Sequence, residues 1–548
     1  MNWRKSVPLG FGVASLAIVW LLATSGNISI TWDEPVYAEV AERAAHWFAL
    51  ILHGRFTEAF APTTFGYSWG LVNEHPPLTR IISGLGWSMT RGFLSPPLVH
   101  RIGSMMFAAL GLGVIAVLIA RERGLRVALF TVAAILTMPR AFFHAHLATL
   151  DFSVAIVWLG TSLAFFHTIK KTPPKYTPGS VFIRALTLGG LWGIALLTKI
   201  NASLLAPFWV LWILWRRRSW TNLLIWLLSL PIALLTLILG WPWMWRHPIE
   251  GMINWLSFFH THYPIPQWFG GRMYLDNLPW WLPFAIMLVV TPGVLLALAG
   301  IGAMHRRHAS SSLRDWLDLH LLGMIVVLAW FALPHSNLHD ADRMLLPATF
   351  HLAVLSGEGF DALWRWLRER WHGMKTDIRN LIAQILLASA LLSPGLIGII
   401  RLHPFELAYY NELVGGVRGG EKIGLTTIYF ASTYGAFLPQ LNELPPGSKI
   451  WAMPNSFDVL YYYQLNGLLR PDLIMLRPPG WGSFYDNKGV KWAEGWIDEA
   501  DYALIERRQT DFNEQLPNHN RILDWAYTHP ELARVERCGV TLAALYSR

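Results

Sequence analysis

Residues 97–119 read PLVHRIGSMMFAALGLGVIAVLI, and they are followed by Arg121, Arg123 and Arg126 and then by a second apolar run at 127–144. A helix needs about 20 mostly apolar residues to cross a bilayer. Short loops that carry Lys and Arg stay on the cytoplasmic side. This unit of apolar run, basic loop and apolar run therefore predicts two membrane-spanning helices joined on the cytoplasmic side.

The same unit recurs and predicts a polytopic α-helical membrane protein with about 11 transmembrane helices. The apolar runs lie near 8–28, 97–119, 127–144, 152–169, 181–198, 202–215, 221–243, 281–304, 317–334, 343–360 and 381–400. If the N-terminus with Arg4 and Lys5 is inside, every later basic cluster also falls inside, at 121–126, 170–175, 216–218, 306–307 and 365–370. The outer segments are then 29–96, 145–151, 244–280, 335–342 and everything after 400.

The composition supports a bilayer protein. Of the 548 residues, 53% are hydrophobic and 14% are charged, and the mean hydropathy is +0.36, whereas soluble domains carry roughly 25% charged residues. The 30 tryptophans suit a membrane–water boundary. The net charge of +9 comes from clusters between apolar runs, which indicates a topology signal rather than nucleic-acid binding. The single cysteine, Cys538, excludes an internal disulfide and a thiolate zinc site.

The chain divides into two predicted domains, a transmembrane domain at 1–400 and a small extracytoplasmic α/β domain at 401–548. We interpret the first apolar run as an uncleaved anchor, because the residues after it make a poor signal-peptidase site. Strands are expected at 448–454, 472–476, 501–506 and 535–546, a helix at 458–466, and a solvated cytoplasmic connector at 361–380.

An acidic pair, Asp33 and Glu34, follows the first crossing and precedes Pro35. These residues could simply cap a helix, since Pro suits the first helical turn and a carboxylate can accept from free amides. A helix is expected there, because Glu39, Glu42, Arg43, His46 and His53 form a polar stripe opposite Val40, Trp47, Phe48 and Ile51. Capping needs only one carboxylate, so we favour a base placed at the membrane surface.

Further polar residues are expected on the same outer face. Glu74 and His75 precede a double proline, Asp151 precedes a long apolar run, and Lys199 and Arg343 lie at outer helix ends. Asp151 could also cap its helix. Basic residues on the outer side are explained by a phosphate ligand, which Arg and Lys bind through charge-assisted hydrogen bonds.

Histidines add to the outer polar set at positions 260, 262, 335 and 339. A carboxylate with two histidines can ligate zinc, but the spacing here matches no established signature. We therefore expect His262 to bind substrate and assign no metal ligand. No cofactor is assigned either, and a divalent metal stays an open alternative.

The order of these motifs resembles the GT-C superfamily of integral-membrane glycosyltransferases. The resemblance is to the branch that contains the protein O-mannosyltransferases and the bacterial lipid A aminoarabinose transferase, and it covers roughly residues 1–400. It is carried by the Asp33-Glu34 pair, the Glu-X-Pro-Pro-Leu turn at 74–78, Asp151, the Leu-Thr-Lys motif at 197–199 and the Arg-Met-Leu-Leu-Pro segment at 343–347. The segment at 401–412 is also similar to one in bacterial members of this group.

The resemblance implies an inverting, hexosyl- or pentosyl-transferring glycosyltransferase in the bacterial inner membrane, with its active site on the periplasmic or extracellular side. The donor would be a sugar on a polyprenyl phosphate, and the acceptor a hydroxyl of a glycolipid, glycan or protein. By position, Asp33 would be the general base, with Glu34 and Asp151 beside it as catalytic residues, and Glu74, His75, Lys199, His262 and Arg343 would bind substrate. Lys199 and Arg343 would stabilise the lipid-phosphate leaving group.

Two departures from the family concern the substrates. His75 stands where the aminoarabinose transferase has a lysine, and the large extra lumenal domain of the protein O-mannosyltransferases is not seen.

Two other function classes stay open. A polytopic transporter or lipid flippase would normally show paired halves and binding groups near the bilayer midplane, whereas these ionisable residues gather at one face. A membrane scaffold that binds a partner through its C-terminal domain is the third hypothesis.

Overall fold

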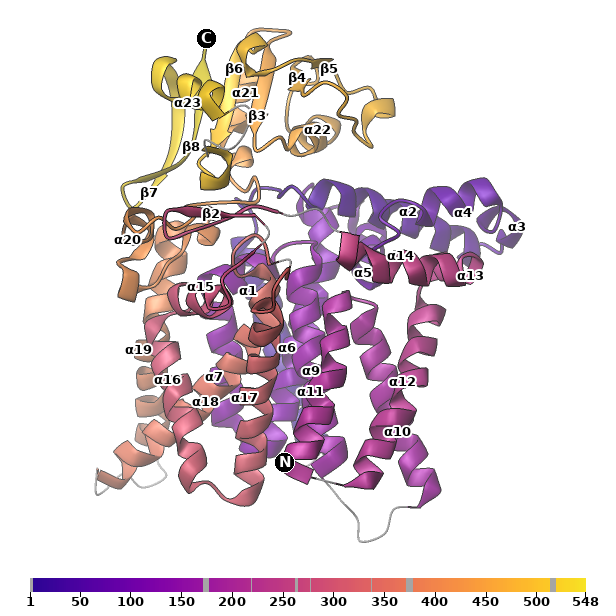
Figure 1. Cartoon of the computed structure of the whole chain (residues 1–548), viewed down its shortest axis with the longest axis vertical. Helices are drawn as coiled ribbons and strands as arrows, with labels where there is room; N and C mark the ends of the chain where they lie inside the picture. The colour runs from indigo at the N-terminus through magenta and orange to yellow at the C-terminus, as the bar shows by residue number, and fades with distance from the viewer. Residues whose placement is uncertain are drawn as a thin grey trace.

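The structure is a computed structural model that describes residues 3–170, 177–217, 219–261, 265–275, 277–336, 338–370, 378–512 and 519–548. Long helices form one bundle along the long axis of the molecule, and the C-terminal sheet covers the end of the bundle opposite the N-terminus (Figure 1). The bundle helices are α1 (Trp3–Thr24), α6 (Leu98–Arg123), α7 (Leu125–Thr137), α9 (Leu150–Lys170), α10 (Pro178–Leu196), α11 (Leu205–Trp212), α12 (Trp220–Gly240), α16 (Gly293–His305), α17 (Ser311–Phe331), α18 (Leu346–Arg370) and α19 (Ile378–Leu402).

Within the described residues, six helices are long and apolar enough to cross a membrane, and two bent helix pairs raise the number to eight. The six are α1, α6, α9, α10, α12 and α19. They coincide with predicted crossings in each case, so the chain is an integral membrane protein with several apolar helices.

Two predicted crossings are wrong as straight spans. The run at 127–144 is divided between α7 and α8 (Pro139–Ala145), which meet at 83°. The run at 281–304 is divided between α15 (Leu282–Val290) and α16, and this break is bent by 115°. A proline lies at each break, Pro139 as the first residue of α8 and Pro292 directly before α16. Because proline cannot donate to the helical ladder and clashes with the preceding turn, the axis changes direction there.

The run at 202–215 also differs from one regular helix. It comprises a 3-10 turn (Ile200–Leu204), α11 and a π-helical turn (Ile213–Arg217). The first half of the expected solvated connector at 361–380 is helical, since α18 continues to Arg370. Asp361 and Trp364 are buried there, whereas Arg365, Arg368 and Arg370 are exposed as expected. Residues 371–377 lie outside the described part of the chain.

Shorter helices form a layer across the long helices, at the end of the bundle that carries the C-terminal sheet (Figure 1). They are α2 (Glu34–Leu52), α3 (Phe56–Ala59), α4 (Pro62–Trp69), α5 (Leu78–Thr90), α13 (Pro242–Arg246), α14 (Pro248–Thr261) and α15. The amphipathic helix expected after the first crossing is α2, which buries Val40 and Trp47 as predicted. Trp47, Phe65 and Trp69 form an aromatic cluster that holds α2 and α4 together.

The C-terminal domain contains a mixed six-stranded sheet in the order β5-β4-β3-β6-β8-β7. Strands β5, β4, β3 and β6 are parallel, and β8 and β7 are added antiparallel. The strands are β3 (Lys449–Met453), β4 (Ile474–Arg477), β5 (Trp492–Glu494), β6 (Tyr502–Glu506), β7 (Glu531–Arg537) and β8 (Val540–Ser547), and the remaining elements of this region are α20 (Gly416–Lys422), α21 (Leu438–Glu443), α22 (Phe457–Leu465) and α23 (His519–Thr528). A two-stranded hairpin, β1 (Gln267–Phe269) with β2 (Arg272–Tyr274), lies in an outer loop.

Three of the four predicted strands and the predicted helix are present. The single strand expected at 535–546 is wrong, because the chain reverses at Cys538 and Gly539, which both have positive φ, and forms the β7–β8 hairpin. Strand β5 was not predicted. It is only three residues long and half exposed, which leaves little hydrophobic pattern to detect.

The C-terminal domain packs directly on the outer end of the bundle. Ile30 and Leu147 belong to the same hydrophobic cluster as Leu460 of α22. The Ile30 amide donates to the Tyr463 hydroxyl at 2.8 Å, and the Tyr485 hydroxyl donates to the Pro35 carbonyl at 3.1 Å. The domain therefore touches the turn that carries Asp33 and Glu34.

The close approach of α16 and α18 generates a stability prediction. A Cβ atom on Gly359 would lie 1.9 Å from the carbonyl oxygen of Leu298, whereas a Cβ on Gly300 of α16 would meet nothing within 4 Å. We expect Gly359→Ala to lower the free energy of unfolding by about 1–3 kcal/mol, because the obstructing atom is backbone and cannot rotate away. Gly300→Ala is the control, and thermal unfolding in detergent measures both. Equal melting temperatures for the two variants would contradict this packing.

Candidate active site

The turn between α1 and α2 presents its two carboxylates in different directions. Asp33 is the residue before α2, yet its side chain makes no capping hydrogen bond. Pro35 occupies the first turn of α2, where the missing amide costs nothing. The capping interpretation is therefore wrong for Asp33, whose carboxylate is directed elsewhere.

Glu34 is buried and fully engaged by its own neighbours. Its two carboxylate oxygens accept from Arg101 Nε at 2.7 Å and Arg101 Nη2 at 2.6 Å. They also accept from the Thr31 amide at 2.9 Å and the Ala148 amide at 3.0 Å. Arg101 in turn donates to the carbonyls of Ile28 and Ser29. These contacts favour a structural role for Glu34 over the catalytic role expected from the sequence.

Asp33 joins a second charged group centred on Arg343. Arg343 Nη1 donates to Asp33 Oδ2 at 2.7 Å and lies 3.9 Å from Asp151 Oδ2. Lys199 Nζ donates to the other oxygen of Asp151 at 2.6 Å. Asp33, Asp151, Lys199 and Arg343 thus form one connected network, although they come from four separate parts of the chain.

The loop that carries Arg343 is held in a strained conformation. Asp340 and Ala341 have φ values of 52° and 54°, in the left-handed region that non-glycine residues rarely adopt. Asp342 anchors the loop by accepting from Arg140 Nη1 at 2.8 Å, and Asp340 lies 3.3 Å from Arg343 Nη2. These contacts hold the Arg343 guanidinium at the network.

Unpartnered polar atoms face the same region. Arg343 Nε and both ring nitrogens of His144 are buried and have no hydrogen-bond partner within the described residues. His144 is close enough to Asp151 and Arg343 to interact electrostatically with both. Buried polar atoms without partners are uncommon and call for a ligand or a water molecule.

Burial governs the chemistry of Asp33. Desolvation raises the pKa of its carboxyl above the usual 3.8, and the nearby Asp151 and Asp340 carboxylates act in the same direction. The Arg343 guanidinium opposes this shift and lowers the pKa. Because the side chain is 29% exposed, Asp33 can still be reached by a substrate while its pKa lies above that of an ordinary surface aspartate.

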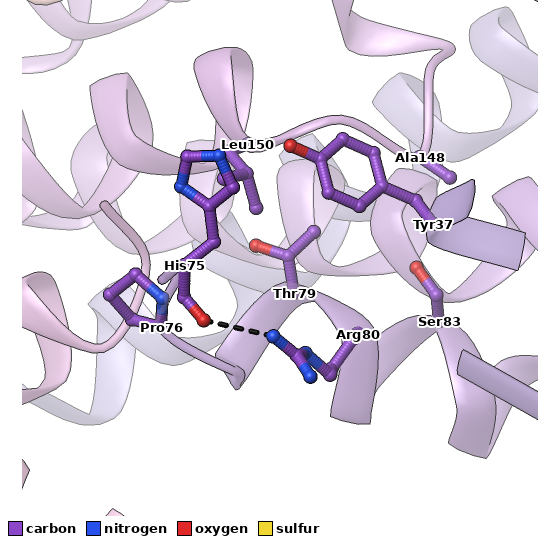
Figure 2. Close-up of a pocket in the computed structure, with 8 residues that line it drawn as sticks. All are labelled: Tyr37, His75, Pro76, Thr79, Arg80, Ser83, Ala148 and Leu150. Atoms are coloured by element: carbon purple, nitrogen blue, oxygen red, sulfur yellow. Dashed lines mark hydrogen bonds between the residues drawn. The ribbon is translucent and has the colours of Figure 1, made fainter. Parts of the chain in front are cut away.

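A small pocket adjoins this network. It is lined by Tyr37, His75, Pro76, Thr79, Arg80, Ser83, Ala148 and Leu150. Figure 2 shows the His75 ring and the Tyr37 hydroxyl on opposite sides of Leu150, with Arg80 below them. His75 and Tyr37 of this pocket are both close enough to Asp151 and Arg343 to interact with them electrostatically, so the pocket lies beside the charged network.

Arg80 holds the turn that carries Glu74 and His75. It is buried, and it donates to the carbonyls of Leu71, Val72 and His75. Burial lowers the pKa of His75 to about 3, and the cations Lys199, Arg80 and Arg343 act in the same direction, so the imidazole is neutral at physiological pH. Glu74 is close enough to Tyr37 and Arg80 to influence the pKa of both.

The structure therefore brings most of the predicted site residues together. Asp33, Asp151, Lys199 and Arg343 form the network, and His75 lines the pocket. Glu74 is close to the pocket residues Tyr37 and Arg80, whereas Glu34 is paired with Arg101. His262 lies outside the described residues. Within the described part of the chain, no group of three or more His, Cys, Asp or Glu is placed to hold a metal ion.

Sequence reasoning missed several members of the site: Tyr37, Arg80, His144 and Asp340. Tyr37 lies one helical turn after Asp33, so helical spacing could have indicated it. Asp340 stands three residues before Arg343, in a segment already singled out. Arg80 and His144 gave no such signal, because both occur in apolar surroundings where a buried structural role is equally plausible.

Comparison with solved structures shows the fold. ArnT from Cupriavidus metallidurans in the apo state aligns with a TM-score of 0.54 and 15% identity, covering 99% of this chain and 98% of ArnT. The structure of the same enzyme bound to undecaprenyl phosphate aligns with a TM-score of 0.51, 16% identity and the same coverage. An apo oligosaccharyltransferase from Archaeoglobus fulgidus aligns at a TM-score of 0.47 and 11% identity, over 84% of this chain and 64% of that one.

The chain thus has the fold of ArnT from Cupriavidus metallidurans over nearly its full length. The resemblance inferred from the motifs is confirmed at the level of the fold. No protein-family model matches the chain, and a search of curated proteins found no significant match.

The two neighbouring carboxylates should differ sharply in their effect on stability. Glu34→Gln leaves the buried Arg101 without its ionic partner, so we expect a loss of about 3–5 kcal/mol in the free energy of unfolding. Asp33→Asn should cost no more than about 1 kcal/mol, because the side chain is partly exposed and Arg343 retains Asp151 and Asp340. Thermal unfolding of the two purified variants tests this contrast. A larger loss for Asp33→Asn would show that the structural and reactive carboxylates are assigned the wrong way round.

Proposed function

We propose that the protein is an inverting glycosyltransferase that moves a sugar from a polyprenyl-phosphate carrier to an acceptor hydroxyl at the outer face of the membrane. One observation carries the proposal: a partly exposed carboxylate, Asp33, lies within hydrogen-bonding distance of Arg343 in a network that also contains Lys199 and Asp151. A base beside cations is what this transfer requires, because a hydroxyl must lose a proton while a phosphate departs.

The proposed step balances with these groups alone. The acceptor oxygen attacks the anomeric carbon, its proton passes to Asp33, and the bond between the anomeric carbon and the phosphate oxygen breaks. The departing lipid phosphate keeps the bonding electron pair, and Arg343 and Lys199 stabilise its added charge. Attack opposite the leaving group inverts the anomeric centre.

Donor binding would also prepare the base. A phosphate that binds Arg343 competes with Asp33 for the guanidinium, and the Arg343 Nε group is a further donor with no partner among the described residues. Loosening the ion pair removes the influence that lowers the pKa of Asp33. Asp33 would then be a stronger base when the donor is in place.

The carrier lipid is supported by two features. The ArnT structure with undecaprenyl phosphate has the same fold as this chain. In addition, a second, small pocket borders the Arg343 loop at Ala341 and is lined by apolar residues such as Leu282, Ile286 and Val290. Apolar side chains at this position suit the isoprene chain next to the phosphate.

The other site residues take supporting roles in this proposal. Asp151 holds Lys199 toward the phosphate rather than acting as a base, because Lys199 already occupies one of its oxygens. Neutral His75 and Tyr37 face the adjoining pocket and would contact the sugar or the acceptor. Glu34, through its ion pair with Arg101, would hold the turn that carries Asp33. Glu74 would help to shape the pocket through its proximity to Tyr37 and Arg80.

The proposed topology has about eleven crossings with the site on the periplasmic or extracellular side of a bacterial inner membrane. Helices α17 and α18 run with the apolar helices in the bundle (Figure 1), although their charged residues make them less apolar than the six candidate spans. Their acids are neutralised within the bundle, as in the Arg216–Asp315 pair at 2.7 Å and the Arg123–Glu358 pair at 2.6 Å. Such pairing lets charged residues stay near the membrane.

Asp33→Asn should abolish transfer while the protein still binds undecaprenyl phosphate, because an amide cannot accept the proton but Arg343 and Lys199 remain. The assay supplies a panel of undecaprenyl-phosphate hexoses and pentoses and measures released undecaprenyl phosphate. In the wild type, kcat/KM should fall as the pH drops through the pKa of Asp33, which burial places above 3.8. Full activity of Asp33→Asn would refute the assigned base.

Labelling of the native cysteine tests on which side of the membrane the C-terminal domain lies. Cys538 is exposed and lies in the β7–β8 turn of the C-terminal domain. A membrane-impermeant maleimide added to intact spheroplasts should label Cys538 as fully as it does after lysis. A matched control carries Cys538→Ser and Arg307→Cys, whose new thiol should react only after lysis. The reverse pattern would place the active site in the cytoplasm and end the proposal.

A further inference from the structure

The segment that joins the C-terminal domain to the active site contains two strained residues in succession. Phe430 and Ala431 have φ values of 79° and 52°. Seven non-glycine residues in the described ranges have positive φ, and six of them lie in the segments that carry site residues, namely Val72, His335, Asp340, Ala341, Phe430 and Ala431. Backbone strain of this kind persists only where the surrounding structure enforces it.

Glu506 enforces the conformation at 430–431. This residue ends β6 of the C-terminal sheet, and its side chain is completely buried. One carboxylate oxygen accepts from the Ala431 amide at 3.0 Å, and the other accepts from the Thr433 amide at 3.2 Å and the Thr433 hydroxyl at 2.8 Å. Three donors on one short segment therefore converge on a single carboxylate from the sheet.

The segment held by Glu506 contacts the site on two sides. The Phe430 carbonyl accepts from the Trp32 amide at 3.1 Å, which fixes the residue next to Asp33. The Phe430 ring lies edge-on to Trp32, with ring centres 5.3 Å apart. The same ring lies 4.8 Å from the Arg343 guanidinium carbon, in cation–π geometry. Phe430 therefore contacts both the segment of the base and its cationic partner.

The chain after Glu506 provides a second link to the same two segments. Arg508 stacks on the Trp32 ring at 4.8 Å, and its Nη2 group donates to Asp340 at 3.3 Å. Asp340 in turn lies beside Arg343. The end of β6 thus contacts the Asp33 segment and the Arg343 loop twice, once through Phe430 and once through Arg508.

We propose that Glu506 is a positioning residue through which the C-terminal sheet sets the relative placement of Asp33 and Arg343. This inference rests on the proposed transferase function and extends it, because it gives the C-terminal domain a part in the reaction. Glu506 touches neither substrate, and it acts through Phe430. The domain would then complete the active site rather than merely cover it.

The primary variant is Glu506→Gln, which keeps the size of the side chain but turns an amide NH2 group toward backbone donors. Glu506→Asp keeps the carboxylate and serves as the conservative rescue. The matched control is Glu494→Gln. Glu494 likewise ends a parallel strand of the same sheet, the edge strand β5, but it is exposed and accepts only from the Gly480 amide among the described residues. All three variants are made in the full-length protein.

Three measurements are made on each variant. Hydrogen–deuterium exchange followed by mass spectrometry reports the mobility of residues 30–38 and 339–345. Intrinsic tryptophan fluorescence measures the affinity for undecaprenyl phosphate, which serves as the probe of the Arg343 site. The transfer assay with the undecaprenyl-phosphate sugar panel separates kcat from the KM for the donor.

We expect Glu506→Gln to speed exchange selectively at 30–38 and 339–345. Undecaprenyl phosphate should bind about tenfold more weakly, and kcat should fall about 10- to 100-fold, as misplacement of reacting groups does elsewhere. Glu506→Asp should recover a large part of kcat, and Glu494→Gln should match the wild type throughout.

The inference is overturned if exchange at 30–38 and 339–345 stays at the wild-type level in Glu506→Gln, or if the variant melts earlier but has normal kcat per folded molecule. It is also overturned if Glu494→Gln causes the same changes. The failure of the proposed function would look different. If the wild-type protein transfers no sugar but Glu506→Gln still speeds exchange at 30–38 and 339–345, the proposed function is refuted while the link between Glu506 and the Arg343 site stands.

Discussion

The buried ion pair between Glu34 and Arg101 is the contact on which the outer end of this molecule depends. Arg101 is on α6, and Glu34 begins α2, so the pair ties the first outer turn to the bundle. The Ala148 amide, close to Asp151, donates to the same carboxylate. An ion pair inside a protein must satisfy all its hydrogen bonds to offset desolvation, and this pair does so with backbone groups from separate segments. That requirement brings the Asp33 turn and the Asp151 turn into register.

Next to this ion pair, the candidate site contains several charged side chains that no single segment of the chain could stabilise alone. Asp33, Asp151 and Asp340 share the cations Arg343 and Lys199, and each left-handed residue in the surrounding loops costs roughly 1–2 kcal/mol. Such strain is tolerated where packing and hydrogen bonds offset it. The C-terminal sheet supplies part of that support through Glu506, and Arg80 of α5 supplies another part by donating to the Val72 carbonyl. The candidate site is therefore assembled from the bundle, the layer of shorter helices and the C-terminal domain together.

Much of the fold followed from local patterns, and the misses have physical causes. Apolar runs predicted the long helices, and alternation predicted three strands of the sheet. Proline at positions 139 and 292 bent two runs that hydropathy alone presents as continuous. At the site, motif order grouped Asp33, Asp151, Lys199 and Arg343 correctly in space. The same motifs treated Glu34 as a partner of Asp33 because the two are adjacent, whereas adjacent residues at a turn point in different directions.

Hydropathy and the placement of charge by themselves determined that this chain builds a helical membrane bundle followed by an α/β domain. The reason is that each polar residue placed in lipid costs free energy, so a membrane-spanning segment must be apolar along its whole length. Hydropathy and charge also selected the segments whose polar side chains meet in the candidate site. Tertiary structure alone decided which charges meet: Arg343 lies 310 positions from Asp33, and Arg101 lies 67 positions from Glu34. Contacts over such separations depend on how helices pack and where they bend, and no local pattern encodes that geometry.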